Sequence, residues 1–260
     1  MFSLFLQLSN ITKQFENHGN LQTVLSPIDV TIEEGEFVSI LGPSGCGKST
    51  LLSIVAGLTK PTTGEIRLQN SVITKPGKDR GMVFQQAALF PWMSVEENVL
   101  FAIRDSISKE ERVERAHHFL KMVQLSSNLK QYPHELSGGM QQRVSIARAL
   151  AMDTTVLLMD EPFGALDEQT RLRLQQELET IWLETKKTIL FVTHSIYESI
   201  KLSDRILVMG TRPGSIIADI KVDIDRPRLR THERVVKLEG EISNLLQKEI
   251  EKVIQEELKI

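Results

Sequence analysis

Short apolar runs recur along the chain, and each is bounded by polar residues or glycines. They occupy residues 35–42, 155–160, 188–194 and 205–210. Each run is too short for a typical helix, so the pattern predicts buried strands. Stretches with helical periodicity separate the runs, and this alternation is typical of a parallel sheet covered by helices on both faces.

Other segments show a clear period. Leu4, Leu6 and Leu8 recur at every second position, which predicts a half-buried strand. We do not expect a signal peptide there, because the run is short and lacks a basic leader. Apolar residues at i, i+4, i+7 and i+8 predict amphipathic helices over residues 174–182 and 238–246.

Composition narrows the possible classes of protein. The 260 residues suffice for one large domain or two small ones, and 41% apolar with 25% charged residues is ordinary for a globular protein. The net charge of −3 gives no argument for nucleic acid as a partner. The one cysteine, Cys46, excludes an internal disulfide. No run approaches the ~18–20 apolar residues that span a bilayer, so we expect a cytoplasmic protein. If it works at a membrane, a partner must hold it there.

A glycine-rich turn separates the first run from a predicted helix over residues 48–56. Gly42, Gly47, Lys48 and Ser49 match the pattern G-x-x-x-x-G-K-[ST]. The glycines let backbone N–H groups surround phosphate oxygens, and the positive end of the helix adds to the attraction. Lys48 is suited to reach the β- and γ-phosphates, and the Ser49 hydroxyl is suited to bind Mg²⁺. The alternative is a chance glycine-rich turn.

Two acids end the second run. Asp160 is placed to hold Mg²⁺, and Glu161 is placed to orient and deprotonate a water that attacks the γ-phosphate. A helix-capping acidic pair in a turn is the alternative.

A second glycine pair follows Ser137 and precedes a predicted helix. Gly138 and Gly139 leave backbone donors exposed, which makes this helix start another potential phosphate site. A helix capped by Ser137 explains the same residues. One nucleotide does not need two such helices from one chain, but two facing copies of the chain can each supply one to the other's nucleotide.

Five segments in order, GPSGCGKST, VFQQAALFPW, LSGGMQQR, VLLMDEPFGALDEQTR and FVTHS, give the chain a family resemblance. Over about residues 5–220 it resembles the ATP-hydrolysing subunits of ABC transporters. YPHELSGGM, FPWMSVEENV and RPGSII are similar to the branch of nitrate, sulfonate and taurine importers.

The resemblance implies an α/β fold with a P-loop NTPase core. The sheet is expected to be mostly parallel, with an antiparallel β region near the N-terminus and an inserted helical subdomain. Residues 1–87 and 154–222 are predicted to form the ATP-binding core, 88–153 the helical subdomain with the signature motif, and 223–260 a C-terminal helical extension.

The resemblance also assigns roles in binding and hydrolysis. Asp160 and Gln85 are expected to hold Mg²⁺ with Ser49, Glu161 is the catalytic base, and His194 is the switch histidine at the γ-phosphate. Gln85 joins the metal and water site to the helical subdomain. The phosphate loop comprises Gly42, Pro43, Ser44, Gly45, Cys46, Gly47, Lys48, Ser49 and Thr50.

Further residues are implied at the nucleotide and at the interface with a second copy. Ser137, Gly138 and Gly139 form the signature that closes on the partner's ATP, and Asp167 lies at the dimer interface. Phe15 occupies the place of the aromatic residue that stacks on adenine, with a core position as the alternative. Trp92 is either core or part of a groove for a membrane subunit. Ser195 is a departure, because aspartate commonly follows the switch histidine.

We therefore expect the energy-coupling ATPase of an importer, using ATP and Mg²⁺. It would work as a homodimer on two transmembrane permease subunits at the cytoplasmic face of the membrane, and indirectly with a solute-binding protein, without nucleic acid. One alternative is an ABC ATPase of DNA repair, although the chain lacks the long coiled coil of that class. Another is a regulatory nucleotide-binding module, although Lys48, Glu161 and His194 are all present.

Overall fold

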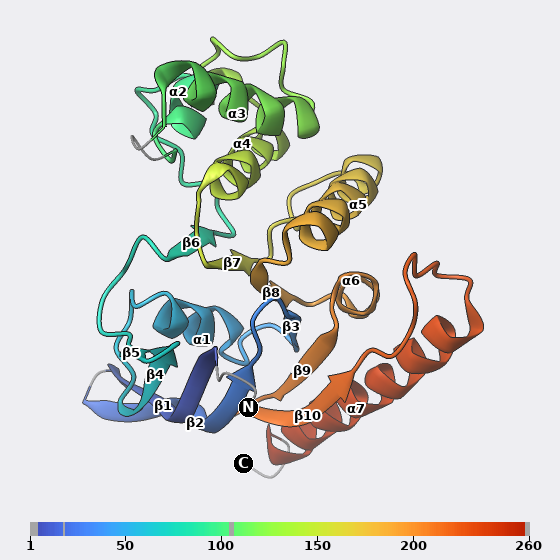
Figure 1. Ribbon diagram of the computed structural model, residues 1–260. Coiled ribbons are helices and arrows are strands. Elements are labelled where there is room, and N and C mark those ends of the chain that lie inside the picture. Colours follow the sequence, from blue (N-terminus) through green and yellow to red (C-terminus); the bar gives the residue numbers. More distant parts are fainter. Residues whose placement is uncertain (1–4, 18, 104–106, 258–260) are drawn as a thin grey trace. The chain divides into compact units, whose positions relative to one another are not determined.

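The chain forms two compact units, each described here by itself (Figure 1). The computed structural model describes residues 5–17, 19–103 and 107–257, without the side chains of 253–257. Residues 1–77 and 186–260 make up the phosphate-loop unit, and residues 78–185 make up the signature unit. The functional boundaries predicted from sequence, at 87/88, 153/154 and 222/223, stay a prediction.

An antiparallel sheet begins the phosphate-loop unit. Its strand order is β2-β1-β4-β5, with β1 Leu6–Asn17, β2 Asn20–Ile32, β4 Thr63–Leu68 and β5 Ser71–Val72. Leu6 and Leu8 are buried as their spacing predicts, while Leu4 lies outside the described residues. The expected antiparallel region is thus confirmed. β2 was not anticipated, because its first residues are exposed and Pro27 falls at a register shift against β1.

The second sheet of this unit is mostly parallel. β3 (Phe37–Leu41) lies between β8 (Thr188–Thr193) and β9 (Arg205–Gly210) and runs parallel to both, and β10 (Ser215–Lys221) pairs antiparallel with β9. β3 and β8 are buried along their whole length. Such strands read as continuous apolar runs because both of their faces are covered.

Helices follow these strands as predicted. α1 (Lys48–Val55) follows β3, and α6 (Ile196–Leu202) follows β8. The long α7 (Glu233–Glu257) packs against α6 and β9 (Figure 1). Within the described residues, no helix combines the length and apolar character that a membrane crossing requires.

The signature unit joins a parallel strand pair to a group of helices. β6 (Arg80–Val83) pairs with β7 (Val156–Asp160). The helices are α2 (Val95–Leu100), α3 (Lys109–Met122), the 3₁₀ turn η1 (Pro133–Glu135), α4 (Gly138–Ala151) and α5 (Glu168–Thr185). Ser94 and Ser108 start α2 and α3 with complete capping boxes. α4 packs against α2 and α3 (Figure 1). The expected α/β class is confirmed.

Candidate functional site

The phosphate loop begins where β3 ends, pressed against β9. A Cβ on Gly42 would lie 2.7 Å from the Met209 carbonyl oxygen and 2.9 Å from Cys46 Sγ. These distances are too short for a side chain, so only glycine allows the backbone to pass here. Cys46 is itself buried, and its sulfur fills the space beside Gly42.

Gly47 marks the start of α1 and is required for two reasons. Its φ of 95° is in the left-handed region, and a Cβ there would lie 2.6 Å from Leu25 Cδ2. Gly45 also has a positive φ, of 80°. Among the described residues, no side chain caps α1 by a hydrogen bond. The first N–H groups of α1 are therefore suited to receive an anion.

Lys48 is held across this loop. Its side chain is 5% exposed, and its Nζ donates to the Gly42 and Pro43 carbonyl oxygens, both at 2.9 Å. The ammonium is thus fixed at the loop before any phosphate arrives. Ser44 and Ser49 are exposed, while Pro43 and Thr50 are partly buried.

Gly214 supports the loop from behind, a role that sequence reasoning missed. A Cβ on Gly214 would lie 2.0 Å from the Cys46 carbonyl oxygen. Two backbone hydrogen bonds join Gly214 to β2. The Gly214 N–H donates to the Val24 carbonyl oxygen, and the Gly214 carbonyl oxygen accepts from the Ser26 N–H. The segment RPGSII had indicated only a branch of the family. No local signal links it to the loop, because the contact is long-range.

The register of the sheet brings His194 to the phosphate loop. Leu41 pairs with Thr193, so Gly42 and His194 both follow neighbouring strand ends. The His194 side chain is exposed, as a ligand-contacting residue must be. Ser195 accepts a hydrogen bond from the Glu198 N–H and caps α6, a position that aspartate also favours. The departure at Ser195 therefore preserves the helix start.

Phe15 lies on β1 in the same unit. It is 43% exposed, and Lys13 Nζ lies 4.6 Å from the centre of its ring. This exposure excludes the core alternative and leaves the ring accessible for stacking.

The acidic pair belongs to the signature unit. Asp160 is buried at the end of β7. Glu161 follows with φ of 45°, a left-handed conformation that is strained for a residue with a side chain. Such strain clusters at functional sites. Val83, the last residue of β6, pairs with Met159 of β7. Gln85 therefore lies just beyond the end of β6, next to the end of β7 where Asp160 lies. Gln85 is exposed.

The helix that carries the signature also holds the loop around Gln85. Buried Gln142 of α4 donates to the Phe84 carbonyl oxygen at 3.1 Å. Arg148 of α4 donates to the carbonyl oxygens of Ala87 and Ala88. One rigid helix thus connects the signature to the Gln85 loop. Neither residue was predicted, because a buried polar side chain gives no sign in the sequence of what it bonds.

The signature residues lie at the start of α4. Ser137 accepts a hydrogen bond from the Met140 N–H at 3.3 Å, so the serine does cap the helix. Gly138 has open space on its Cβ side, with nothing within 4 Å among the described residues, and Gly139 would make only ordinary contacts. The capping alternative explains the serine but leaves the two glycines unexplained.

Asp167 caps α5 in turn. It accepts a hydrogen bond from the Thr170 N–H at 3.0 Å. This hydrogen bond is the main cause that lowers the pKa of Asp167 below its usual value, so the exposed side chain is a carboxylate at neutral pH. Its role at a dimer interface stays a prediction.

Trp92 stands on an apolar surface of the signature unit. It is 68% exposed, which excludes the core alternative, and its ring lies 5.6 Å from Phe90. The buried Asn98 amide fixes the turn beneath by bonding Phe90, Met93 and Ser94. Beside it is an open groove of about 640 Å³, lined by Phe84, Phe90, Phe101, Ile103, Arg148 and Met152, among others.

Comparison with known proteins places the chain in a family. The ABC transporter family matches residues 25–164, more than half of the chain. An uncharacterised ABC transporter ATP-binding protein of Methanocaldococcus jannaschii is 49% identical over 96% of this chain and 94% of its own length. The chain therefore belongs to the ABC transporter family, and its fold is that of the ATP-binding cassette, an ATPase.

Relatives with assigned solutes confirm the branch. An aliphatic sulfonates import ATP-binding protein of Bacillus thuringiensis is 44% identical, covering 91% of this chain and 94% of that protein. A nitrate import ATP-binding protein of Synechocystis is 42% identical, covering 94% and 95%. A solved ATP-binding cassette, dimeric in a post-hydrolysis state with ADP and Pi, has a TM-score of 0.77 at 37% identity, covering 85% of this chain and all of that one.

Proposed function

We propose that this chain is the energy-coupling subunit of an importer for a small solute such as an aliphatic sulfonate, taurine or nitrate. The observation that carries the proposal is nearly full-length similarity to import ATP-binding proteins, together with a phosphate loop already formed around Lys48. ATP closes a homodimer of the chain, and hydrolysis opens it.

The phosphate loop binds the triphosphate in this proposal. The N–H groups at the start of α1 and the Lys48 ammonium contact the β- and γ-phosphates. Phe15 stacks on adenine. Ser49, Gln85 and Asp160 would hold Mg²⁺, and they suit it because all three offer oxygen donors and Asp160 is a carboxylate. When bound, the ion neutralises charge on the phosphate oxygens.

Glu161 and His194 act on the terminal phosphate. Glu161 accepts a proton from the attacking water as a general base. His194 contacts the γ-phosphate as it separates. The strained backbone at Glu161 and the exposed side chain of His194 support these roles, because backbone strain clusters at functional sites and a residue that contacts a ligand must be accessible.

The signature serves the second copy of the chain. The open Cβ side of Gly138 lets another molecule come close to the α4 N-terminus, and Ser137 with its neighbouring N–H groups contacts the partner's γ-phosphate. Gly139 allows the same close approach. The carboxylate of Asp167 lies at the interface. The dimeric state of the similar cassette supports this arrangement.

The groove beside Trp92 receives a membrane subunit. Two such permease subunits hold the dimer at the cytoplasmic face of the membrane and link it to a solute-binding protein. The exposed aromatic surface supports this role, since large apolar patches mark interaction sites. Hydrogen bonds from Arg148 and Gln142 to the loop 84–88 give a direct path from this groove to Gln85 and the signature.

Reconstitution tests the proposal. The chain is purified with transmembrane permease subunits and placed in liposomes with the matching solute-binding protein. We expect ATP hydrolysis that rises with one of the sulfonate, taurine or nitrate solutes, together with its uptake. Solute-independent hydrolysis without any uptake would contradict an importer role while leaving the ATPase intact.

A further inference from the structure

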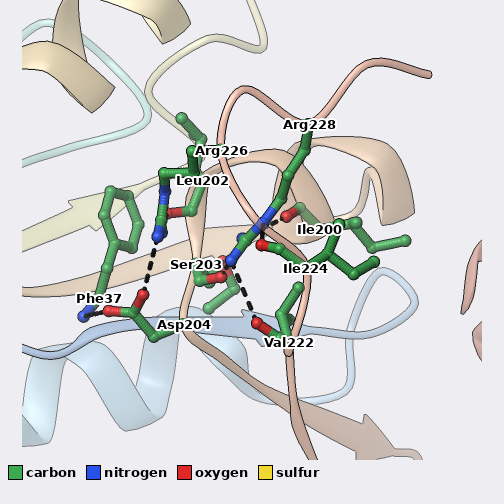
Figure 2. A network of polar contacts seen from close by, with 10 residues as sticks. Phe37, Ile200, Leu202, Ser203, Asp204, Val222, Ile224, Arg226 and Arg228 are labelled. Atoms are coloured by element: carbon green, nitrogen blue, oxygen red, sulfur yellow. Dashed lines mark hydrogen bonds and ion pairs between the residues drawn. The ribbon is translucent and has the colours of Figure 1, made fainter. Parts of the chain in front are cut away.

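Arg228 is buried on the connection between β10 and α7. Its side chain is 4% exposed. Figure 2 shows its guanidinium pointing into a ring of backbone oxygens. It donates to the carbonyl oxygens of Ile200, Ser203, Val222 and Ile224. One side chain therefore fastens α6, the end of β10 and the connection itself.

Two of these bonds cap α6. The last carbonyl groups of a helix lack partners within it and favour a positive charge. Arg228 donates hydrogen bonds to the carbonyl oxygens of Ile200 and Ser203. Arg226 donates to the carbonyl oxygen of Leu202 at 2.8 Å. The end of α6 is thus fixed by arginines from a segment more than 20 residues away.

Arg226 also reaches the strand that leads to the phosphate loop. Its guanidinium pairs with Asp204 at 3.0 Å, and Asp204 accepts a hydrogen bond from the Phe37 N–H at 3.1 Å (Figure 2). Phe37 is the first residue of β3. The Ser203 hydroxyl contacts the hydroxyl of Ser39 in the same strand.

Apolar packing ties α7 to the same place. Val235 and Ile242 of α7 are fully buried in one cluster with Leu41 and Ile200. Leu41 directly precedes Gly42, and Ile200 lies in α6. The C-terminal helix therefore shares one apolar cluster with the last residue of β3 and with α6.

The position of α6 also determines the position of His194. The helix has only seven residues and starts at Ile196, two residues after the histidine. At its start, the Thr193 hydroxyl donates a hydrogen bond to the Glu198 carboxylate at 2.6 Å. Thr193 Oγ1 also accepts a hydrogen bond from the Ser195 N–H at 3.0 Å. His194 therefore lies between two anchored neighbours, and a displacement of α6 displaces it.

We propose that Arg228, assisted by Arg226, is a positioning residue that sets His194 for its contact with the γ-phosphate by fixing α6. This inference rests on the proposed role of His194 in hydrolysis. It makes the C-terminal segment, from residue 223 on, part of the hydrolytic apparatus of the phosphate-loop unit.

A double-mutant cycle on the full chain tests this inference. Arg228→Lys keeps the charge but loses the planar fork of donors. We expect the kcat for ATP hydrolysis with Mg²⁺ to fall roughly 10- to 100-fold, as for a small misplacement of a catalytic group, with ATP affinity unchanged. In a His194→Ala background the same change should have no further effect. Arg67→Lys, at an exposed pair with Glu65, should leave kcat unchanged.

The outcomes distinguish the positioning role of Arg228 from the proposed role of His194. All rates are measured well below the melting temperature of each variant. If Arg228→Lys does not fold, the same measurements are made with Arg226→Lys. Unchanged kcat in the arginine variant, or a fall that persists without His194, would overturn the inference. Unchanged kcat in His194→Ala alone would overturn the proposed role of His194 and the inference with it.

Discussion

The two helix starts that carry glycines look alike in sequence and differ in structure. At α1, Gly47 has a φ of 95° and a Cβ position already occupied by Leu25, 2.6 Å away. At α4, Ser137 caps the helix, and Gly138 has nothing within 4 Å of its Cβ position in the described part of the chain.

The difference shows what each glycine is for. The fold itself favours glycine at position 47, because other residues rarely adopt that backbone conformation and a Cβ would meet Leu25. The fold of the single chain gives no such reason for Gly138, although glycine in a helix costs about 0.5–1 kcal/mol relative to alanine. We infer that the space beside Gly138 is used by something outside this chain. We propose that the phosphate loop serves the chain's own nucleotide and that the signature serves that of the second copy.

Loss of the base gives the largest expected effect. Glu161→Gln should lower hydrolysis by ~10²–10⁴, because a positioned general base is gone, while ATP still binds through the phosphate loop. Phosphate release by the purified variant and parent is the measurement. Turnover close to that of the parent would show that Glu161 is not the base.

Loss of the loop cation acts on binding. Lys48→Ala should weaken ATP binding roughly 10- to 100-fold, the value of a hydrogen bond to a charged group. Equilibrium binding of labelled ATP measures it, with Lys237→Ala on the exposed face of α7 as the control. If Lys48→Ala retains the parent's affinity, the loop does not bind the triphosphate as proposed.

Substitutions of Gly47 and Gly138 should change the stability of the chain by different amounts. Gly47→Ala should destabilise the chain by about 1–3 kcal/mol, since a left-handed backbone and a close contact both oppose a methyl group. Gly138→Ala should be neutral or slightly stabilising. Denaturant unfolding of both variants and the parent gives the two values. Equal losses would remove the structural distinction between the sites.

Trp92→Ala should have the smallest effect on the isolated chain. The side chain is 68% exposed, so melting temperature and basal hydrolysis should stay near those of the parent. Transport by the assembled complex should fall, because the exposed aromatic surface beside the groove for the membrane subunit is lost. A lowered melting temperature together with lower hydrolysis would make Trp92 a structural residue.

Local patterns predicted much of this fold. The runs that became β3, β7, β8 and β9 are continuous and apolar, because each strand is buried on both faces. The phosphate loop was predictable because its pattern is local and lies between a strand and a helix. β2 gave no such signal, since half of it is exposed and a proline interrupts it.

Long-range polar contacts were beyond sequence reasoning. Arg228 stands in a stretch that resembles a linker, yet it bonds carbonyl oxygens up to 28 residues away. Gln142 and Asn98 are buried amides that hold loops through backbone carbonyls. A sequence shows the donor in such cases but not its acceptor, so these supporting residues emerge only from the fold.

If the start of α4 acts on the nucleotide of a second copy, the chain should form a dimer that depends on ATP. Glu161→Gln with ATP should accumulate as a dimer, because hydrolysis no longer opens it. Adding Gly138→Asp should give a monomer that still binds ATP, since its carboxylate repels the partner's phosphates. Adding Gly240→Asp instead, at an equally open glycine of α7, should leave the dimer intact. Size-exclusion chromatography with light scattering distinguishes these states. A Glu161→Gln, Gly138→Asp variant that still dimerises with ATP would show that the start of α4 does not contact the nucleotide of the second copy.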